Sequence, residues 1–429
     1  MKELLQKAAA HVEQAEIYVK RVEDHSVSFQ ASKLKEITHT SEETTTLRLL
    51  HEGKLGSSQT TKPGSEDTML QYALNTVKYG SPVNYSFPGE AKLGEVNIYD
   101  PNVTKVSLQE MLDIGADLIA ALTAYDPNIK ALAGVSKSLS STSLENTLGF
   151  FGESLQSGWS LYFGGEYTSD EGFLTIYDSI AGAFLNRDVE KLKRHIIESF
   201  RIARNIVPFK EGQYPVIFSP SEVKTLITPM VACLSGKAIS RGFSPWKGRL
   251  GEPLLDPRFS LVDDALVNGA VGSKAFDREG TPTSKRALFS NGILSGYLLD
   301  LQTAAELKMA PTGNGSIMGP TVNNLILEGG STSYLTMIED IEEGVLIDST
   351  MGAWAGNPYG GQVSGNISLG YKIEKGKLVG RIKDCMFSLN VFTDLRDNLV
   401  RLSSEQSWKG NFCFPHVQLG NINITTKGE

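Results

Sequence analysis

The chain has 429 residues, which is enough for about two or three domains of the usual size. Hydrophobic residues make up 40% and charged residues 21% of it, and this composition excludes a disordered or fibrous protein. The 49 acidic and 41 basic residues give a net charge of −8. Because this balance provides no basic surface, direct binding to nucleic acid is not expected.

The sequence predicts a cytoplasmic protein. Its first residues lack the continuous apolar segment of a secretory signal, and no run of about 18 apolar residues predicts a membrane helix. Its cysteines, Cys233, Cys385 and Cys413, are far apart and odd in number, which fits a reducing compartment and excludes a disulfide framework. Since no CxxC occurs, a cysteine-based zinc knuckle is excluded as well.

The first part of the chain alternates between helical and strand patterns. Residues 2–15 have the apolar spacing of a helix, residues 16–61 predict a meander of short strands, and residues 64–80 predict a second helix that begins after Ser65. A second helix–strands–helix unit follows between Ser107 and about residue 205. The repeated order suggests an internal duplication of architecture.

The remainder of the chain is rich in glycine, turns and strand patterns. Asn291-Gly292 and residues 374–376 predict hairpin turns. We therefore predict an α+β fold, with an N-terminal α+β domain over residues 1–210 and a β-rich C-terminal domain over residues 211–429.

A helix is predicted at the start of the C-terminal domain, within residues 219–241. Ser219 or Ser221 is expected to cap it, and an apolar stripe predicts that one side is buried. Pro229 predicts a kink, because proline lacks an N–H and crowds the preceding turn. From these residues alone Cys233, on the stripe, is expected to be a buried apolar side chain rather than a nucleophile.

Several familiar catalytic motifs are absent. The sequence contains no HExxH, HExxxH or GxSxG, and Gly236-Lys237 lacks the other residues of a phosphate-binding loop. The histidines are scattered, so a metal site would have to be assembled from distant residues. The adjacent carboxylates Asp263-Asp264 and Glu342-Glu343 are interpreted as solvated turn residues.

From Arg249 onward the sequence is more specific. It contains EGTPT at 279–283, the Asn291-Gly292 hairpin, and PTGNG at 311–315. With this set of motifs the chain resembles the TldD/PmbA (TldD/TldE) family, also labelled modulators of DNA gyrase. The family-signature residues, which are candidates for a groove or an interface, are Gly280, Thr281, Pro282, Pro311, Thr312, Gly313, Asn314 and Gly315.

The resemblance favours the PmbA/TldE branch. In the TldD branch the helix carries HExxxH, which together with a later cysteine binds a catalytic metal, and its glutamate acts as general base. An ungapped comparison places Thr228 and Cys233 at the two histidine positions and Pro229 at the glutamate position. A hydroxyl, a proline and one thiol are not expected to bind a catalytic zinc.

The resemblance implies a non-catalytic subunit that forms a heterodimer with a zinc-containing, TldD-like metallopeptidase and acts on unfolded or extended peptides. No cofactor is expected in this chain. One alternative is a homodimer that binds peptides or has a structural role without proteolysis. Another is a metallopeptidase with atypical ligands such as Cys233, Cys413 and His416. The gyrase label, taken literally, would require an effect on DNA topology, and the net charge argues against direct DNA contact.

Overall fold

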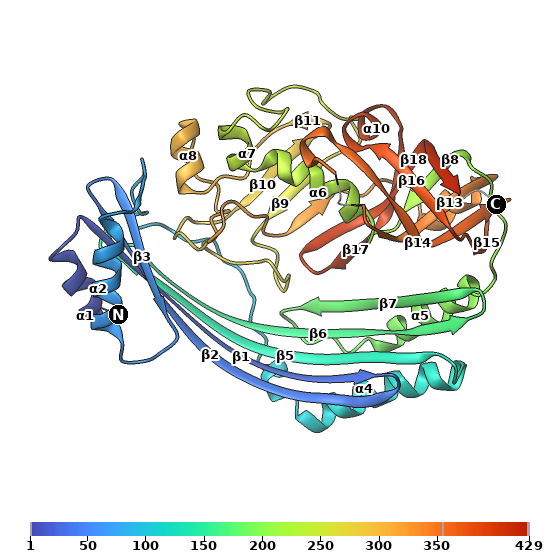
Figure 1. Ribbon diagram of the computed structural model, residues 1–429, viewed down its shortest axis with the longest axis horizontal. Coiled ribbons are helices and arrows are strands. Elements are labelled where there is room, and N and C mark those ends of the chain that lie inside the picture. Colours follow the sequence, from blue (N-terminus) through green and yellow to red (C-terminus); the bar gives the residue numbers. More distant parts are fainter. Residues whose placement is uncertain (1, 354–355, 427–429) are drawn as a thin grey trace.

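The computed structural model describes residues 2–353 and 356–426. The chain forms a long curved sheet followed by a more compact β-rich domain, which lies on the concave side of that sheet (Figure 1). This α+β architecture confirms the predicted fold class. Among the helices of the described residues, none is long and apolar enough to cross a membrane.

The curved sheet has the strand order β4-β3-β2-β1-β5-β6-β7. Its strands are β1 (Gln14–Gln30), β2 (Lys33–His51), β3 (Lys54–Thr60), β4 (Ser81–Pro82), β5 (Lys130–Asn146), β6 (Phe151–Ser169) and β7 (Gly172–Gly182). Its helices are α1 (Lys2–Ala9), α2 (Glu66–Val77), α3 (Pro101–Lys105), α4 (Leu108–Tyr125) and α5 (Val189–Ala203). β1 and β5 form an antiparallel pair, and the order β3-β2-β1 on one side of this junction mirrors β5-β6-β7 on the other, as a duplicated unit would require; β4 has no counterpart.

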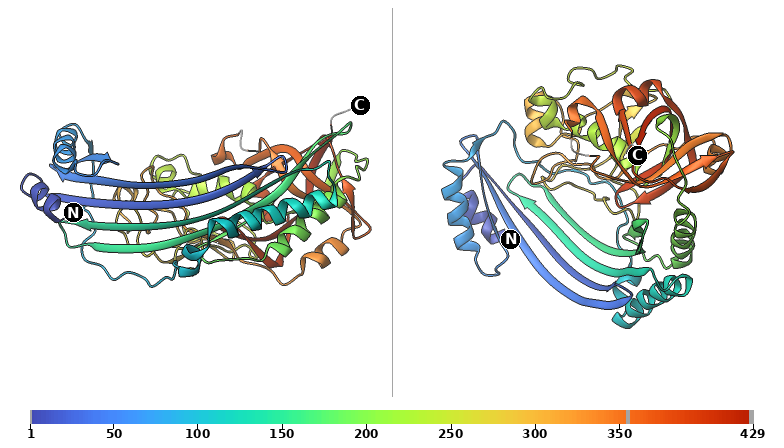
Figure 2. Two further views of the ribbon diagram at one scale, coloured as in Figure 1. Left: turned by 90° about the horizontal axis from the view of Figure 1, so that it is seen from below. Right: turned by 45° about the vertical axis from the view of Figure 1, so that its right-hand side comes forward.

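The two faces of the sheet have different surroundings because side chains alternate along a strand. On the convex face, Ile17 and Val19 of β1 pack in the core that contains residues of α1 and α2, while Val27 and Phe29 pack in the core that contains residues of α4. Figure 2 shows the two groups of helices at opposite ends of the sheet. On the concave face, Tyr18 lies under the guanidinium of Arg278, which belongs to the C-terminal domain.

The strands are longer than the sequence predicted. β1 and β2 run for 17 and 19 residues, where alternation had suggested separate short strands. Polar residues in the middle of both strands interrupt the apolar alternation, because neither face is covered there. Ser107 caps α4 with a complete capping box, as predicted. Ser65 does not cap α2, because its hydroxyl donates to the carbonyl of Lys62 instead.

The C-terminal domain is built around a closed ring of strands, in the order β18-β16-β14-β13-β8, with β8 pairing back to β18. β9, β10, β11 and β12 extend the sheet from β18. The strands are β8 (Gly212–Phe218), β9 (Leu261–Asp264), β10 (Lys285–Ser290), β11 (Ile293–Leu294), β12 (Leu325–Leu327), β13 (Glu343–Met351), β14 (Gln362–Glu374), β15 (Lys377–Arg381), β16 (Cys385–Asn390), β17 (Leu399–Lys409) and β18 (Phe412–Thr426). The helical segments are α6 (Val223–Leu234), α7 (Gly236–Ser240), α8 (Leu301–Leu307), α9 (Tyr334–Glu339), η1 (Pro358–Gly360) and α10 (Val391–Asp397).

The helix predicted over residues 219–241 is two helices. α6 continues through Pro229, and the break falls at Ser235, whose extended backbone separates α6 from α7. The serine caps were also wrong. Glu222 occupies the N-cap position, and its carboxylate accepts from the backbone and hydroxyl of Thr350.

The Asn291-Gly292 hairpin is confirmed. Both residues have positive φ, 48° and 76°, as a two-residue turn between twisted strands requires. The turn packs tightly, because a Cβ on Gly292 would lie 2.2 Å from the carbonyl oxygen of Leu255.

Candidate functional site

The first candidate is α6, whose positions 228, 229 and 233 correspond to the metal motif of the TldD branch. Thr228 is half-buried, and its hydroxyl donates to the carbonyl of Lys224 at 2.9 Å. Pro229 and Cys233 are buried in the core of the domain. Thr228 therefore lies on the partly exposed side of α6, whereas Cys233 lies on the side that packs against the core.

These residues do not fit a catalytic metal ion. Burial raises the pKa of the Cys233 thiol to about 12, so the thiolate that a metal requires is disfavoured. The Thr228 hydroxyl already donates to its own helix, and proline has no side-chain donor atom. We therefore derive no catalytic step through a metal at α6.

The atypical ligands considered from the sequence are not grouped as a metal site. His416 is largely buried, its ring stacks on Tyr334 with centroids 3.9 Å apart, and burial lowers its pKa to about 4. Cys413 pairs in register with Ile326 and Trp408 in the sheet. In the described part of the chain, the group of three His, Cys, Asp or Glu side chains whose ligand atoms converge lies elsewhere, on β1 and β2.

The second candidate is the pair of signature loops, and the structure brings the two loops together. The carboxylate of Asp277 accepts from the backbone N–H groups of Glu279, Thr281 and Gly315 at 2.7–2.9 Å. Gly313 has φ +75°, and a Cβ there would lie 2.8 Å from the carbonyl oxygen of Pro282. One carboxylate therefore fixes both loops.

Most of the signature residues are buried. Thr281, Thr312 and Asn314 are between 1% and 6% exposed, Gly280, Gly313 and Gly315 are also buried, and Pro282 and Pro311 are partly exposed. Their observed contacts hold the loops in shape. A role in a groove or an interface remains a prediction.

Asp263 supports the same loops, and its interpretation as a solvated turn residue was wrong. It is 1% exposed and accepts from the side chains of Asn314 and Asn323 and from the backbone of Asn323 at 2.7–2.9 Å. Asp264, its neighbour, is half-buried. Adjacent acidic residues gave no signal of this burial, because the amide partners lie about fifty or more residues away along the chain.

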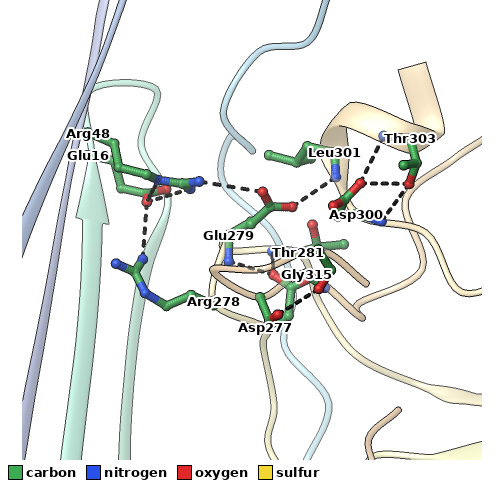
Figure 3. A network of polar contacts seen from close by, with 12 residues as sticks. Glu16, Arg48, Asp277, Arg278, Glu279, Thr281, Asp300, Leu301, Thr303 and Gly315 are labelled. Atoms are coloured by element: carbon green, nitrogen blue, oxygen red, sulfur yellow. Dashed lines mark hydrogen bonds and ion pairs between the residues drawn. The ribbon is translucent and has the colours of Figure 1, made fainter. Parts of the chain in front are cut away.

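An ion-pair network joins these loops to the curved sheet (Figure 3). Arg48 of β2 lies 2.7 Å from Glu16 of β1 and 3.5 Å from Glu279. Glu279 also accepts from the backbone N–H of Leu301 at the start of α8. Arg278 approaches Glu16 from the other domain at 3.8 Å. Sequence reasoning missed this network because no motif connects β1, β2 and the loop.

Burial controls the protonation of this network. Burial raises the pKa of Glu279 to about 7, and the positive charge of Arg48 only partly opposes this shift. Burial lowers the pKa of Arg278 to about 10, and the nearby charge of Arg48 acts in the same direction. For Arg48, the carboxylates of Glu16 and Glu279 outweigh the effect of burial and raise its pKa. Arg48 is therefore the fixed positive charge of the network.

A polar cavity of about 280 Å³ lies between the concave face and the C-terminal domain. Its lining includes Ser136, Ser138 and Ser140 of β5, Gln156 and Ser160 of β6, and Val271 of the C-terminal domain. The hydroxyls of Ser136 and Ser160 are 2.7 Å apart. The residues that line it are uncharged, so the cavity is suited to hydrogen bonding rather than to acid–base catalysis.

Comparison with known proteins places this architecture in a family. The PmbA/TldA metallopeptidase C-terminal domain matches residues 211–426, and domain 1 of the same family matches residues 15–75. TldE from Thermococcus kodakarensis has the same fold, with a TM-score of 0.91 and 23% sequence identity over 99% of both chains.

Relatives match along most of the chain. A protein named Metalloprotease from Methanothermobacter thermautotrophicus is 24% identical and covers 96% of this chain and 95% of its own length. Metalloprotease PmbA of Escherichia coli O157:H7 is 20% identical and covers 98% of this chain and 94% of its own length. Since one family domain alone spans half of the residues, the chain belongs to the PmbA/TldD metallopeptidase family.

Proposed function

We propose that this chain is the non-catalytic, TldE-like subunit of a two-subunit metallopeptidase that acts on unfolded or extended peptides. Its partner would be a TldD-like subunit that carries HExxxH and the catalytic zinc. This chain would contribute one side of the peptide-binding site and a surface that contacts the peptide, and the partner would carry out the hydrolytic step.

The observation that carries the proposal is the state of α6. An open catalytic zinc site needs about three protein ligands and a position for water. Thr228 is satisfied by its own helix, Pro229 has no donor, and Cys233 is a buried neutral thiol. Pro229 and Cys233 would pack α6 against the rest of the domain, and none of the three residues would activate water.

The concave face supports a role in binding extended peptides. Extended peptides are recognised largely through their main-chain N–H and C=O groups. Because these groups are common to all peptides, this mode of recognition allows many sequences to bind. The serine hydroxyls and the Gln156 amide that line the cavity can both donate and accept hydrogen bonds. An uncharged, hydroxyl-rich surface of this kind would favour little sequence selectivity.

The test compares three samples: this chain alone, a TldD-like HExxxH subunit from the same organism alone, and the two co-expressed. We expect a heteromeric complex by light scattering, with chelator-sensitive cleavage of an unstructured peptide that the lone chain does not show. A stable homodimer that binds the peptide without cleaving it, and that ignores the co-expressed subunit, would instead establish the peptide-binding alternative.

Variants of the complex separate the subunits' roles. Thr228→Ala in this chain should leave cleavage within about twofold, because its hydroxyl contacts only its own helix. His→Ala in the partner's HExxxH should abolish cleavage. Chelator-sensitive cleavage by the lone chain that is lost in His416→Ala would overturn the proposal and favour atypical ligands.

A further inference from the structure

Three potential metal ligands converge on the convex face of the curved sheet, between the two groups of helices. Glu23 and His25 are two residues apart on β1, so their side chains point to the same face. His39 of β2 is directly opposite His25 in the antiparallel register. This section of β2 has no strand on its other side in the described structure, because β3 pairs only with Thr45–His51.

The ligand atoms of the three residues lie close together. Glu23 Oε1 lies 3.1 Å from His25 Nε2 and 3.4 Å from His39 Nε2. All three ligand atoms lie within 4.8 Å of one another. The imidazole rings stack with centroids 4.2 Å apart and an interplanar angle of 6°. Both rings therefore present Nε2 to the same carboxylate.

This donor set matches zinc chemistry. Zinc binds imidazole nitrogen and carboxylate oxygen at about 2.0–2.2 Å in tetrahedral geometry, which places neighbouring ligand atoms roughly 3.3–3.5 Å apart. The two distances from Glu23 Oε1 are close to this edge length. Because the rings are nearly parallel, their Nε2 lone pairs point side by side, and both side chains must rotate about their torsions before the two lone pairs converge on one tetrahedral ion.

The surrounding charges leave the carboxylate available. Arg21, two residues before Glu23, is paired with Glu43 across the strands. Lys137, which faces His25 from β5, donates to the carbonyls of Thr104 and Val106 at 3.1 and 2.6 Å. Within the described residues, no lysine or arginine lies within 4.0 Å of the Glu23 carboxylate, which contacts the two imidazoles instead.

We infer that Glu23, His25 and His39 form a binding site for one divalent transition-metal ion, with zinc as the best match. Two nitrogens and one oxygen would hold the ion, and its fourth position would face solvent, where a water or a donor from another molecule can complete the tetrahedron. The ion would clip β1 to the open edge of β2. The inference rests on this cluster alone and is independent of the proposed peptidase role.

The test is zinc titration of the untagged full-length chain by isothermal calorimetry at pH 7.5, after chelator treatment and dialysis. We expect one zinc ion per chain with His25 and His39 intact. His39→Ala should weaken zinc binding by at least about tenfold. Loss of a residue that only hydrogen-bonds to a metal ligand already lowers metal affinity by about this factor, and loss of a ligand itself should lower it at least as much. Binding should also weaken at pH 5.5, because protons compete for imidazole.

A matched control is His51→Ala. His51 is another histidine of β2, with Glu13 at 3.9 Å, and it lies outside the converging trio. Its replacement should leave zinc binding unchanged, and circular dichroism should show that both variants fold. Absence of zinc binding by the native chain, or binding that survives His39→Ala and His25→Ala, would overturn the inference.

Discussion

Arg48 on β2 and Glu279 in the C-terminal domain form an ion pair, with Nη1 and Oε1 3.5 Å apart. Their side chains are only 12% and 9% exposed. Glu16, the other carboxylate bound by Arg48, is fully buried. One arginine therefore compensates two buried acids from two domains, and the packing of the signature loop against the sheet depends on it.

Arg48→Met should destabilise the protein strongly. It leaves Glu16 and Glu279 buried without their main cation, and loss of one partner of a buried pair typically costs about 3–5 kcal/mol. Chemical denaturation at pH 8 measures the loss. Arg21→Met is the control, because Arg21 pairs with Glu43 at the surface and such pairs contribute about 0–1 kcal/mol. Equal losses of stability from the two substitutions would contradict the conclusion that Arg48 compensates the buried charges of Glu16 and Glu279.

The raised pKa of Glu279 predicts a pH dependence. Its folded-state pKa is about 7 against an ordinary value of 4.5, so the folded protein binds the extra proton between these values. Stability contributed by this group should therefore fall as pH rises from about 4.5 to 7, by on the order of 3 kcal/mol.

Glu279→Gln tests this sign, because an amide oxygen can still accept from the backbone of Leu301 without titrating. Denaturation midpoints at pH 5, 6, 7 and 8, at constant ionic strength, should show a flatter profile for the variant than for the native chain. Parallel profiles would show that Glu279 does not titrate in this range.

Gly313→Ala should be far more harmful than Gly248→Ala. Both glycines have positive φ, +75° and +77°, so both replacements carry a backbone strain of about 1–2 kcal/mol. At Gly313 the new Cβ would also meet Pro282 and Thr283 atoms at 2.8–2.9 Å, whereas no atom lies within 4 Å at Gly248. Thermal melts should show a loss at Gly313 at least about 1 kcal/mol greater. Similar losses would mean that the two signature loops are not in tight contact.

The cysteines should be unreactive in the native protein. Cys233, Cys385 and Cys413 are buried, and burial raises the pKa of each thiol to about 11–12. Because the thiolate is the reactive form, native protein treated with iodoacetamide at pH 8 should show little alkylation by mass spectrometry, and urea-unfolded protein should show all three. Rapid native labelling of Cys233 would contradict its buried position on α6.

Local signals in the sequence determined much of the fold. The Asn291-Gly292 turn and the Ser107 capping box each depend on residues a few positions apart, and both form as expected. The apolar stripe of α6 likewise placed Cys233 in the core. The serine caps failed at Ser65, whose hydroxyl donates to the local carbonyl of Lys62, and at Ser219, whose hydroxyl donates to the distant carbonyl of Asp348.

Only the tertiary structure decided the long-range features. Arg48 and Glu279 are 231 residues apart, Asp263 meets its amides 51 and 60 residues later, and β8 closes the ring of strands with β18. A buried charge is tolerated only where folding brings a partner to it, and spacing along the chain does not encode that encounter. The same holds for His25 and His39, whose proximity follows from the register of β1 and β2. The sequence by itself determined local features such as turns and apolar stripes, and it showed that α6 lacks the HExxxH residues. Folding determined which distant side chains meet.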